Sequence, residues 1–206
     1  MNKHKDFDTK FIEAIKAGDL PTVRRLVESG ADPNAPGEHG LSPLHFAQED
    51  EALTRFLVSV GADLNYTGFR EGSILMLAAY SGELDKIALY LELGADVNVA
   101  MPDGGETPLH MAAVTGRTEA AKALLQAGAE PNRHVGSDKQ SDMFNGGAKL
   151  WGETPLHYAA AYGDTEMIEA MLTAGADKNL TNALGEKPLA YAGRHNRPRE
   201  IRSLLS

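Results

Sequence analysis

The sequence predicts an all-α fold made of repeated helix pairs, and two recurring marks carry this prediction. The first mark is a box of one residue, usually Ser or Thr, followed by Pro-Leu-His. It occurs at 42–45, 107–110 and 154–157, with degenerate copies at 73–76 and 187–190. The second mark is Gly-Ala-Asp or Gly-Ala-Glu, which starts at positions 30, 61, 94, 128 and 175. The second mark follows the first by 21 residues in three copies, and the usual period is 33 residues. A fixed period of this length indicates stacked structural repeats.

The spacing divides the chain into six repeats that form one domain, residues 1–206. The expected repeats are 9–41, 42–72, 73–106, 107–153, 154–186 and 187–206. Repeat one has Thr9 at the position of the box, and repeat two is two residues short. Between Gly128 and Thr154 the chain has 26 residues where 12 are usual, which places an insertion at about 133–150.

Each repeat is expected to contain two antiparallel helices followed by an extended turn. Thr107 and Thr154 can cap the first helix, with a proline in the first turn where no backbone donor is lost. A glycine nine residues after the start of the box predicts a left-handed residue that ends this helix. It occurs at Gly18, Gly82, Gly116 and Gly163. Repeat two lacks it, so Asp50 is expected to cap the next helix directly.

The second helices have an apolar face, and Gly-Ala-Asp is expected to end each one. Four residues after that glycine an asparagine recurs, where turn backbone suits it. It occurs at Asn34, Asn65, Asn98, Asn132 and Asn179. A single repeat cannot bury its own apolar face, so stability must come from stacking on neighbours, with polar outer faces on the terminal repeats.

The box, the glycine between helices and Gly-Ala-Asp together resemble the ankyrin-repeat family over nearly the whole chain. The resemblance implies a solenoid of helix-turn-helix repeats with hairpin-like turns, to which the insertion adds one extended loop. It also implies a concave surface, formed by the first helices and the turn tips, that binds other proteins. The box histidines His45, His110 and His157 are then structural, with one ring nitrogen bonded to backbone in the adjoining turn.

Composition limits the function further. The chain has 206 residues, no cysteine, and 20 Lys and Arg against 29 Asp and Glu, which gives a net charge of −9. These values exclude disulfides and thiolate metal sites and disfavour binding to nucleic acid, which requires basic side chains. No apolar run approaches the roughly 20 residues that cross a bilayer. We expect a soluble cytoplasmic protein, monomeric when free, that binds another protein and neither nucleic acid nor membrane.

No motif indicates catalysis. The box histidines are at least a repeat apart, whereas metal ligands must converge on one ion. The glycine-rich stretches lack the ending of a phosphate-binding loop, and no nucleophile elbow is present. We therefore expect no enzyme activity, no catalytic residue, no metal and no cofactor.

Aromatic residues mark the expected binding surface, because nine of the 13 fall on the first helices and turn tips. Aromatic and Met side chains are enriched at interfaces. With two acidic residues of the rim, the candidate partner-binding residues are Phe46, Phe69, Tyr80, Met111, Met143, Phe144, Trp151, Tyr158, Tyr162, Tyr191, Glu106 and Glu153. The alternative is that some of them only pack against neighbouring turns.

Two further features have two interpretations each. The acidic rim would suit a partner with a basic surface, or it is simply solvated. The 133–151 loop contains Met143, Phe144 and Trp151, and it either contacts the partner or packs on its own repeat. The leading functional hypothesis is a non-catalytic protein-interaction module. A dedicated inhibitor, such as an immunity protein that occludes a toxin, is the second, and an enzyme is the third.

Overall fold

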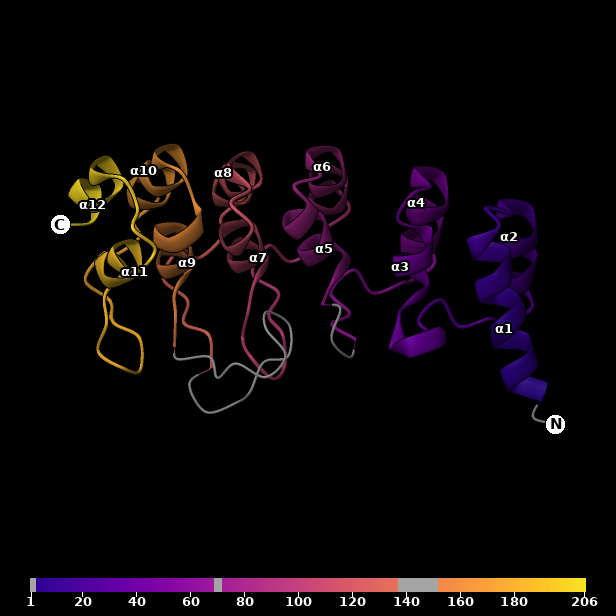
Figure 1. Ribbon diagram of the computed structural model, residues 1–206. Helices are drawn as coiled ribbons and strands as arrows, with labels where there is room; N and C mark the ends of the chain where they lie inside the picture. The colour runs from indigo at the N-terminus through magenta and orange to yellow at the C-terminus, as the bar shows by residue number, and fades with distance from the viewer. Residues whose placement is uncertain (1–2, 69–71, 137–151) are drawn as a thin grey trace. The chain divides into compact units, whose positions relative to one another are not determined.

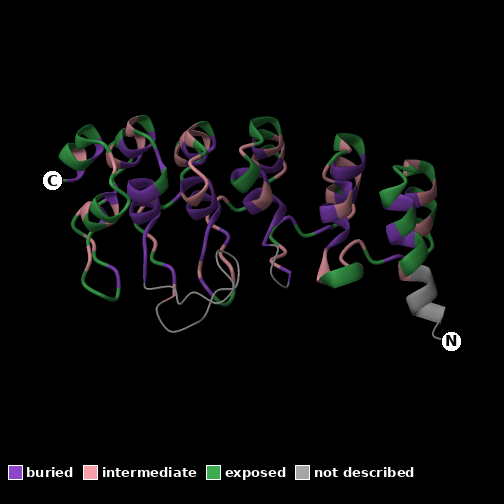
Figure 2. Ribbon diagram, viewed as in Figure 1, coloured by how far each residue is buried: buried purple, intermediate pink, exposed green. Residues whose placement is uncertain are grey.

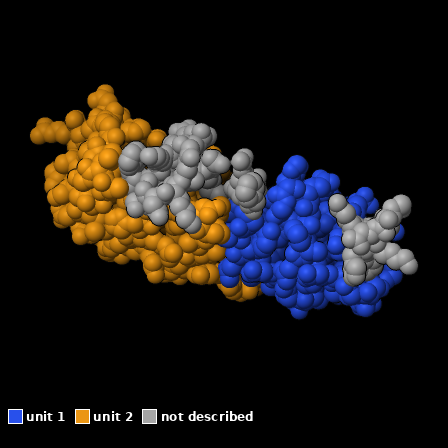
Figure 3. All heavy atoms as spheres, turned by 90° about the horizontal axis from the view of Figure 1, so that it is seen from below, with its two compact units in different colours: residues 1–74 blue, residues 75–206 orange. Residues whose placement is uncertain are grey.

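The computed structural model describes residues 3–68, 72–136 and 152–206, in which every regular element is a helix (Figure 1). An isolated antiparallel bridge joins Gly68 to Gly72. The all-α prediction is therefore confirmed. The chain forms two compact units, unit 1 (residues 1–74) and unit 2 (residues 75–206), which are coloured separately in Figure 3.

The helices alternate between the first and the second helix of each repeat. In chain order they are α1 (Lys3–Lys16), α2 (Leu20–Glu28), the 3-10 turn η1 (Glu38–Gly40), α3 (Pro43–Ala47), α4 (Glu51–Ser59), α5 (Ile74–Ser81), α6 (Leu84–Glu92), α7 (Pro108–Val114), α8 (Thr118–Gln126), α9 (Pro155–Tyr162), α10 (Thr165–Thr173), α11 (Pro188–Arg194) and α12 (Arg199–Leu205). The expected pairs are thus present in all six repeats.

In unit 1, α1 packs against α2 and α3, and α3 packs against α4. The core of this unit includes Phe11, Val23, Leu53 and Leu57, all fully buried. The first helix starts before Thr9, so that residue lies inside α1 and does not cap it.

In unit 2 the helices form two rows. The first helices α7, α9 and α11 pack side by side, and the second helices α6, α8, α10 and α12 form the other row (Figure 1). Most residues of α7 and α9 are buried, as the colouring of Figure 2 shows. Ala112, Ala113, Ala159 and Ala160 have no exposed surface. Their small side chains let adjacent first helices approach closely.

The caps explain where the helices begin and end. Asp50 accepts a hydrogen bond from the backbone of Leu53 at 2.9 Å, as predicted for repeat two. Gly18, Gly82 and Gly116 have positive φ, again as predicted. Gly163 was expected to match them, but its φ is −76° and it is extended, so that prediction is wrong. Glycine is needed there because a side chain would not fit: a Cβ would lie 2.8 Å from the carbonyl oxygen of Ala159.

The box histidines connect adjacent repeats. The backbone N–H of Thr154 donates to Nδ1 of His157 at 3.1 Å, so Nε2 carries the proton and donates to the carbonyl of Glu186 at 3.0 Å. His45 makes the same pair of bonds in unit 1, to Ser42 and to the carbonyl of Gly72. The structural role of these two histidines is confirmed.

The turn asparagines also join repeats, a role that the sequence pattern does not reveal. Asn132 donates to the carbonyl of Gly175 and accepts from the backbone of Asp177, both at 2.8 Å. Asn98 bonds Gly128 and Glu130 in the same way. Each amide therefore ties one turn to the Gly-Ala-Asp of the next repeat.

Candidate partner-binding surface

The structure divides the 12 predicted site residues into three groups of four. Phe69, Met143, Phe144 and Trp151 lie outside the described residues, as does most of the 133–151 loop. Met111, Tyr158, Glu106 and Glu153 are buried. Phe46, Tyr80, Tyr162 and Tyr191 are half-buried or exposed.

The expectation of an exposed position was wrong for the buried group. Met111 and Tyr158 come directly after the box histidine, and this position faces the neighbouring repeat. The Tyr158 ring meets the His110 ring edge-on at a centroid distance of 6.1 Å. Glu106 and Glu153 come directly before the box threonine and are almost fully buried. Burial raises the pKa of Tyr158, and the nearby carboxylates of Glu153 and Glu106 add to this effect.

Exposed aromatic surface gathers instead at the ends of two first helices in unit 2. Tyr80, in the last turn of α5, is 48% exposed, and Tyr162, the last residue of α9, is 46% exposed. Leu84, which begins α6, is 44% exposed. Tyr80, Leu84 and Tyr162 are called the tyrosine edge below. Among the described residues the other exposed large apolar side chain is Leu184, at 55%, in the turn before α11.

Arginine and glycine residues hold the backbone of this edge in place. The side chain of Arg117 donates from Nε to the carbonyl of Tyr80 at 3.4 Å. A Cβ on Gly116 would lie 2.9 Å from the carbonyl oxygen of Tyr162. Arg197 donates to the carbonyl of Ala161 at 3.2 Å and to that of Gly163. The free carbonyls at the ends of α5 and α9 thus receive donors from the next repeat.

A shallow hollow of about 390 Å³ lies at the turns that follow α5, α7 and α9. It runs across the turns between the helices of repeats three to five, from Gly82 past Gly116 and Arg117 to Asp164 and Glu166. Tyr80 is two residues before its first lining residue, and Tyr162 is two residues before Asp164. The two tyrosines are thus close in sequence to the ends of the hollow, although neither lines it.

The charges around this hollow are partly paired. Lys122 contacts Glu119 at 3.1 Å and also pairs with Glu166. The hydrogen bond to Glu166 raises the pKa of the Lys122 ammonium. Three carboxylates, of Glu119, Asp164 and Glu166, line the hollow with one arginine. The region is acidic overall.

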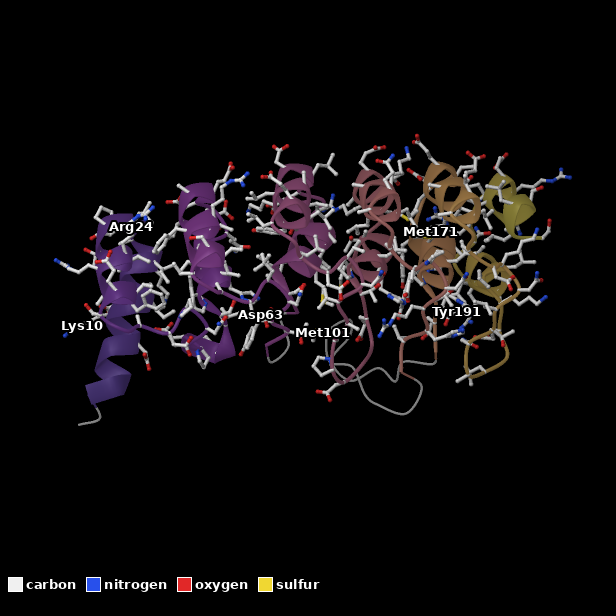
Figure 4. The ribbon with its side chains drawn as sticks, turned by 180° about the vertical axis from the view of Figure 1, so that it is seen from behind. Lys10, Arg24, Asp63, Met101, Met171 and Tyr191 are labelled. Carbon is white, nitrogen blue, oxygen red and sulfur yellow. The ribbon has the colours of Figure 1, made fainter. Side chains whose placement is uncertain are left out.

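At the far end of unit 2 the edge continues into a polar aromatic network. The Tyr162 ring meets the His195 ring edge-on at 5.0 Å. Tyr191, labelled in Figure 4, donates its hydroxyl proton to Glu153 and accepts a hydrogen bond from Asn182 at 3.1 Å. Burial raises the pKa of Tyr191, as does its bond to Glu153. Tyr191 is thus mainly a framework residue with one exposed side.

Phe46 in unit 1 is also partly framework. The ammonium of Lys16 lies over the Phe46 ring, 4.8 Å from the ring centroid. Tyr66, in the turn of repeat two, donates its hydroxyl proton to the carbonyl of Gly40 at 3.0 Å. Neither aromatic side chain is fully exposed.

Sequence reasoning missed Arg117, Arg197 and Leu84. The signal for the two arginines was present, because each lies ten residues after the start of its box, in repeats four and six. Their capping role was not visible without the neighbouring helix. Among the described residues, no group of three or more His, Asp or Glu side chains is placed to hold a metal ion.

Comparison with known proteins agrees with this architecture. A family model described as ankyrin repeats (3 copies) matches residues 11–101 and 51–135, and one described as ankyrin repeats (many copies) matches 109–172. The chain belongs to the ankyrin-repeat family. Ankyrin repeats are generally protein–protein interaction modules.

Relatives in this family are diverse. The chain is 33% identical to protein PhlB of Serratia liquefaciens over 123 residues, which cover 58% of this chain and 54% of that protein. It is 34% identical to the human neurogenic locus notch homolog protein 2 over 121 residues, 57% of this chain and 5% of that one. The matches thus span from one twentieth to about half of these relatives.

A solved structure resembles the whole fold. The crystal structure of an ankyrin repeat domain from Acinetobacter baumannii AYE superposes with a TM-score of 0.74 at 26% identity, covering 95% of both chains. Among the described residues, no helix combines the length and the apolar character that crossing a membrane requires.

Proposed function

We propose that this protein is a non-catalytic binding module that holds a partner protein against the tyrosine edge of unit 2. The observation that carries the proposal is the exposure of Tyr80 and Tyr162, each nearly half accessible on a first helix whose other large apolar residues are buried or half-buried. Exposed tyrosines on a rigid scaffold supply contact area at low entropic cost, and such residues often dominate binding energy.

The support is geometric as well as compositional. Arg117 and Arg197 fix the ends of α5 and α9, so the edge is ordered before a partner arrives. Pre-organisation lowers the entropic cost of association. The hollow at the turns after α5 and α9 provides a recess into which a partner side chain can project.

The acidic lining of the hollow supports a partner with a basic surface. The net charge of −9 would steer such a partner toward the protein. An inhibitor or immunity protein for a basic enzyme would use the same surface. It differs from an adaptor in one measurable way: the partner's activity would be lost in the complex.

Affinity purification with matched variants tests the proposal. Tagged wild type, the Tyr80→Ala/Tyr162→Ala double variant and Glu169→Ala would be used to capture partners from the native cell. Glu169 is exposed on α10, in the other row of helices. The proposal predicts a partner that co-elutes with wild type and Glu169→Ala and is lost with the double variant.

Calorimetry then gives the magnitude. The double variant should bind that partner at least about 30-fold more weakly, which corresponds to about 2 kcal/mol. Circular dichroism must show an unchanged helical fold. Equal affinity of wild type and the folded double variant would refute the tyrosine edge as the binding surface.

A further inference from the structure

A second hollow lies in unit 1. Its volume is about 260 Å³, and it is formed by one side of α1 and the segment 36–38. From α1 it takes Thr9, Ile12, Glu13 and Lys16, the spacing of a single helix face, together with the adjacent Asp8. This hollow is called the α1 pocket.

The inner wall of the α1 pocket is apolar. Ile12 is only 5% exposed and belongs to the core of unit 1. The backbone of Gly37 lies directly on the Phe46 ring, since a Cβ at Gly37 would be 2.6 Å from Cε2 of that ring and 3.4 Å from Cδ1 of Ile12. Glycine thus keeps segment 36–38 close to the ring.

The rim of the pocket is acidic. It has three carboxylates, those of Asp8, Glu13 and Glu38, and one cation, Lys16. The Lys16 ammonium lies 3.3 Å from a carboxylate oxygen of Glu38 and 4.8 Å from the centroid of the Phe46 ring. A cation therefore already uses this combination of carboxylate and aromatic ring within the chain. In the part of the chain that the structure describes, neither Asp8 nor Glu13 has an ion-pair partner.

We propose that the α1 pocket binds an arginine side chain of a partner protein. The aliphatic stem of arginine would pack along Ile12 and Pro36, and its guanidinium would meet the carboxylates of Asp8 and Glu13. Arginine suits this site better than lysine, because its planar, weakly hydrated head pairs with carboxylates through several fixed donors. An acidic or purely apolar side chain would leave the rim charges unmatched.

A small probe tests this without knowledge of the partner. Nα-acetyl-arginine methylamide would be titrated into the 15N- and methyl-labelled full chain. Nα-acetyl-citrulline methylamide, which has the same shape and no charge, is the control. The arginine probe should shift the Ile12 methyl and Gly37 amide signals in a saturable way. Citrulline should bind at least about fourfold more weakly, the effect of one carboxylate roughly 5 Å away in a water-like dielectric.

Matched variants assign the effect to the pocket. Asp8→Asn/Glu13→Gln should weaken arginine binding by about tenfold, whereas Glu28→Gln, which removes an exposed carboxylate from α2, should leave it unchanged. Lys16→Gln should strengthen binding, because it removes the competing cation. Raising the salt concentration should weaken binding to wild type.

Three results would overturn the proposal. They are equal shifts with citrulline, no shift at Ile12 and Gly37 with arginine, or undiminished binding by the folded Asp8→Asn/Glu13→Gln variant. The tyrosine edge is untouched in all these variants. Failure of the α1 pocket and failure of the proposed binding surface are therefore read from different experiments.

Discussion

Acidification from pH 7.5 to pH 5.0 should destabilise the protein by about 2 kcal/mol through His110 alone. The His110 side chain has no exposed surface, and its Nε2 has no hydrogen-bond partner. Burial lowers its pKa from 6.5 to about 3, an effect that the nearby backbone carbonyls of Glu153 and Arg133 only partly offset. The folded protein therefore keeps this histidine neutral.

The magnitude follows from the protons bound in each state. At pH 5.0 the unfolded chain binds a proton at this histidine, because its pKa there is near 6.5, and the folded chain does not. The pKa of His110 in the unfolded chain lies about 1.5 units above pH 5.0, and this gap corresponds to about 2 kcal/mol of lost stability. This stability is fully present above pH 6.5 and is lost as the pH falls from 6.5 toward 3. Burial also lowers the pKa of His157, which adds to the loss in the same direction.

Urea unfolding monitored by circular dichroism at pH 7.5, 6.0 and 5.0 measures this effect. The matched variant is His110→Met, because repeat three has a methionine, Met76, at the position of the box histidine. Its stability should fall by about 2 kcal/mol less than that of wild type between pH 7.5 and 5.0. His39→Asn changes an exposed histidine with a φ of 58° and should follow wild type. Parallel pH curves for wild type and His110→Met would refute the reasoning.

Three further substitutions, each paired with a control substitution, test the packing between repeats by urea unfolding. Tyr191→Phe should cost about 1–2 kcal/mol because the hydroxyl bonds to Glu153 and Asn182 are lost, whereas Tyr162→Phe, with an exposed side chain, should change little. Gly116→Ala should destabilise by more than about 1 kcal/mol, since its φ is +65° and the new Cβ would crowd the carbonyl of Tyr162. Gly193→Ala, in α11 with open space around the Cβ position, should instead stabilise the protein by about 0.5–1 kcal/mol. Changes of the same sign in the free energy of unfolding for the two alanine variants would contradict the account. Asn132→Ala should cost about 1–2 kcal/mol through two lost bonds to the next repeat, and a cost no larger than that of Asn179→Ala would count against it.

The repeat architecture was predictable because each residue type that marks the period meets one local structural requirement. Proline in the first helical turn and glycine with positive φ are local requirements, and Gly18, Gly82 and Gly116 meet them. Gly163 shows where local reasoning fails. Its backbone is extended, and glycine is needed there because of contacts with Ala159 and Met167.

The binding surface was harder to predict, because exposure depends on the neighbouring repeat. The position after the box histidine holds an aromatic residue in several repeats, and sequence alone could not tell whether it faces solvent. In repeat five it faces His110, so Tyr158 is buried, while Tyr162 four residues later is exposed. The caps formed by Arg117 and Arg197 also depend on a helix from another repeat.

Site-specific photo-crosslinking tests the central claim, that a partner binds at the tyrosine edge, most directly. A benzophenone amino acid would replace Tyr162 on α9 in one sample and Glu169 on α10 in another, and each would be irradiated with the purified partner. We expect a crosslinked complex from position 162 and none from position 169. Crosslinking from 169 without any from 162 would place the partner on the other row of helices and contradict the account.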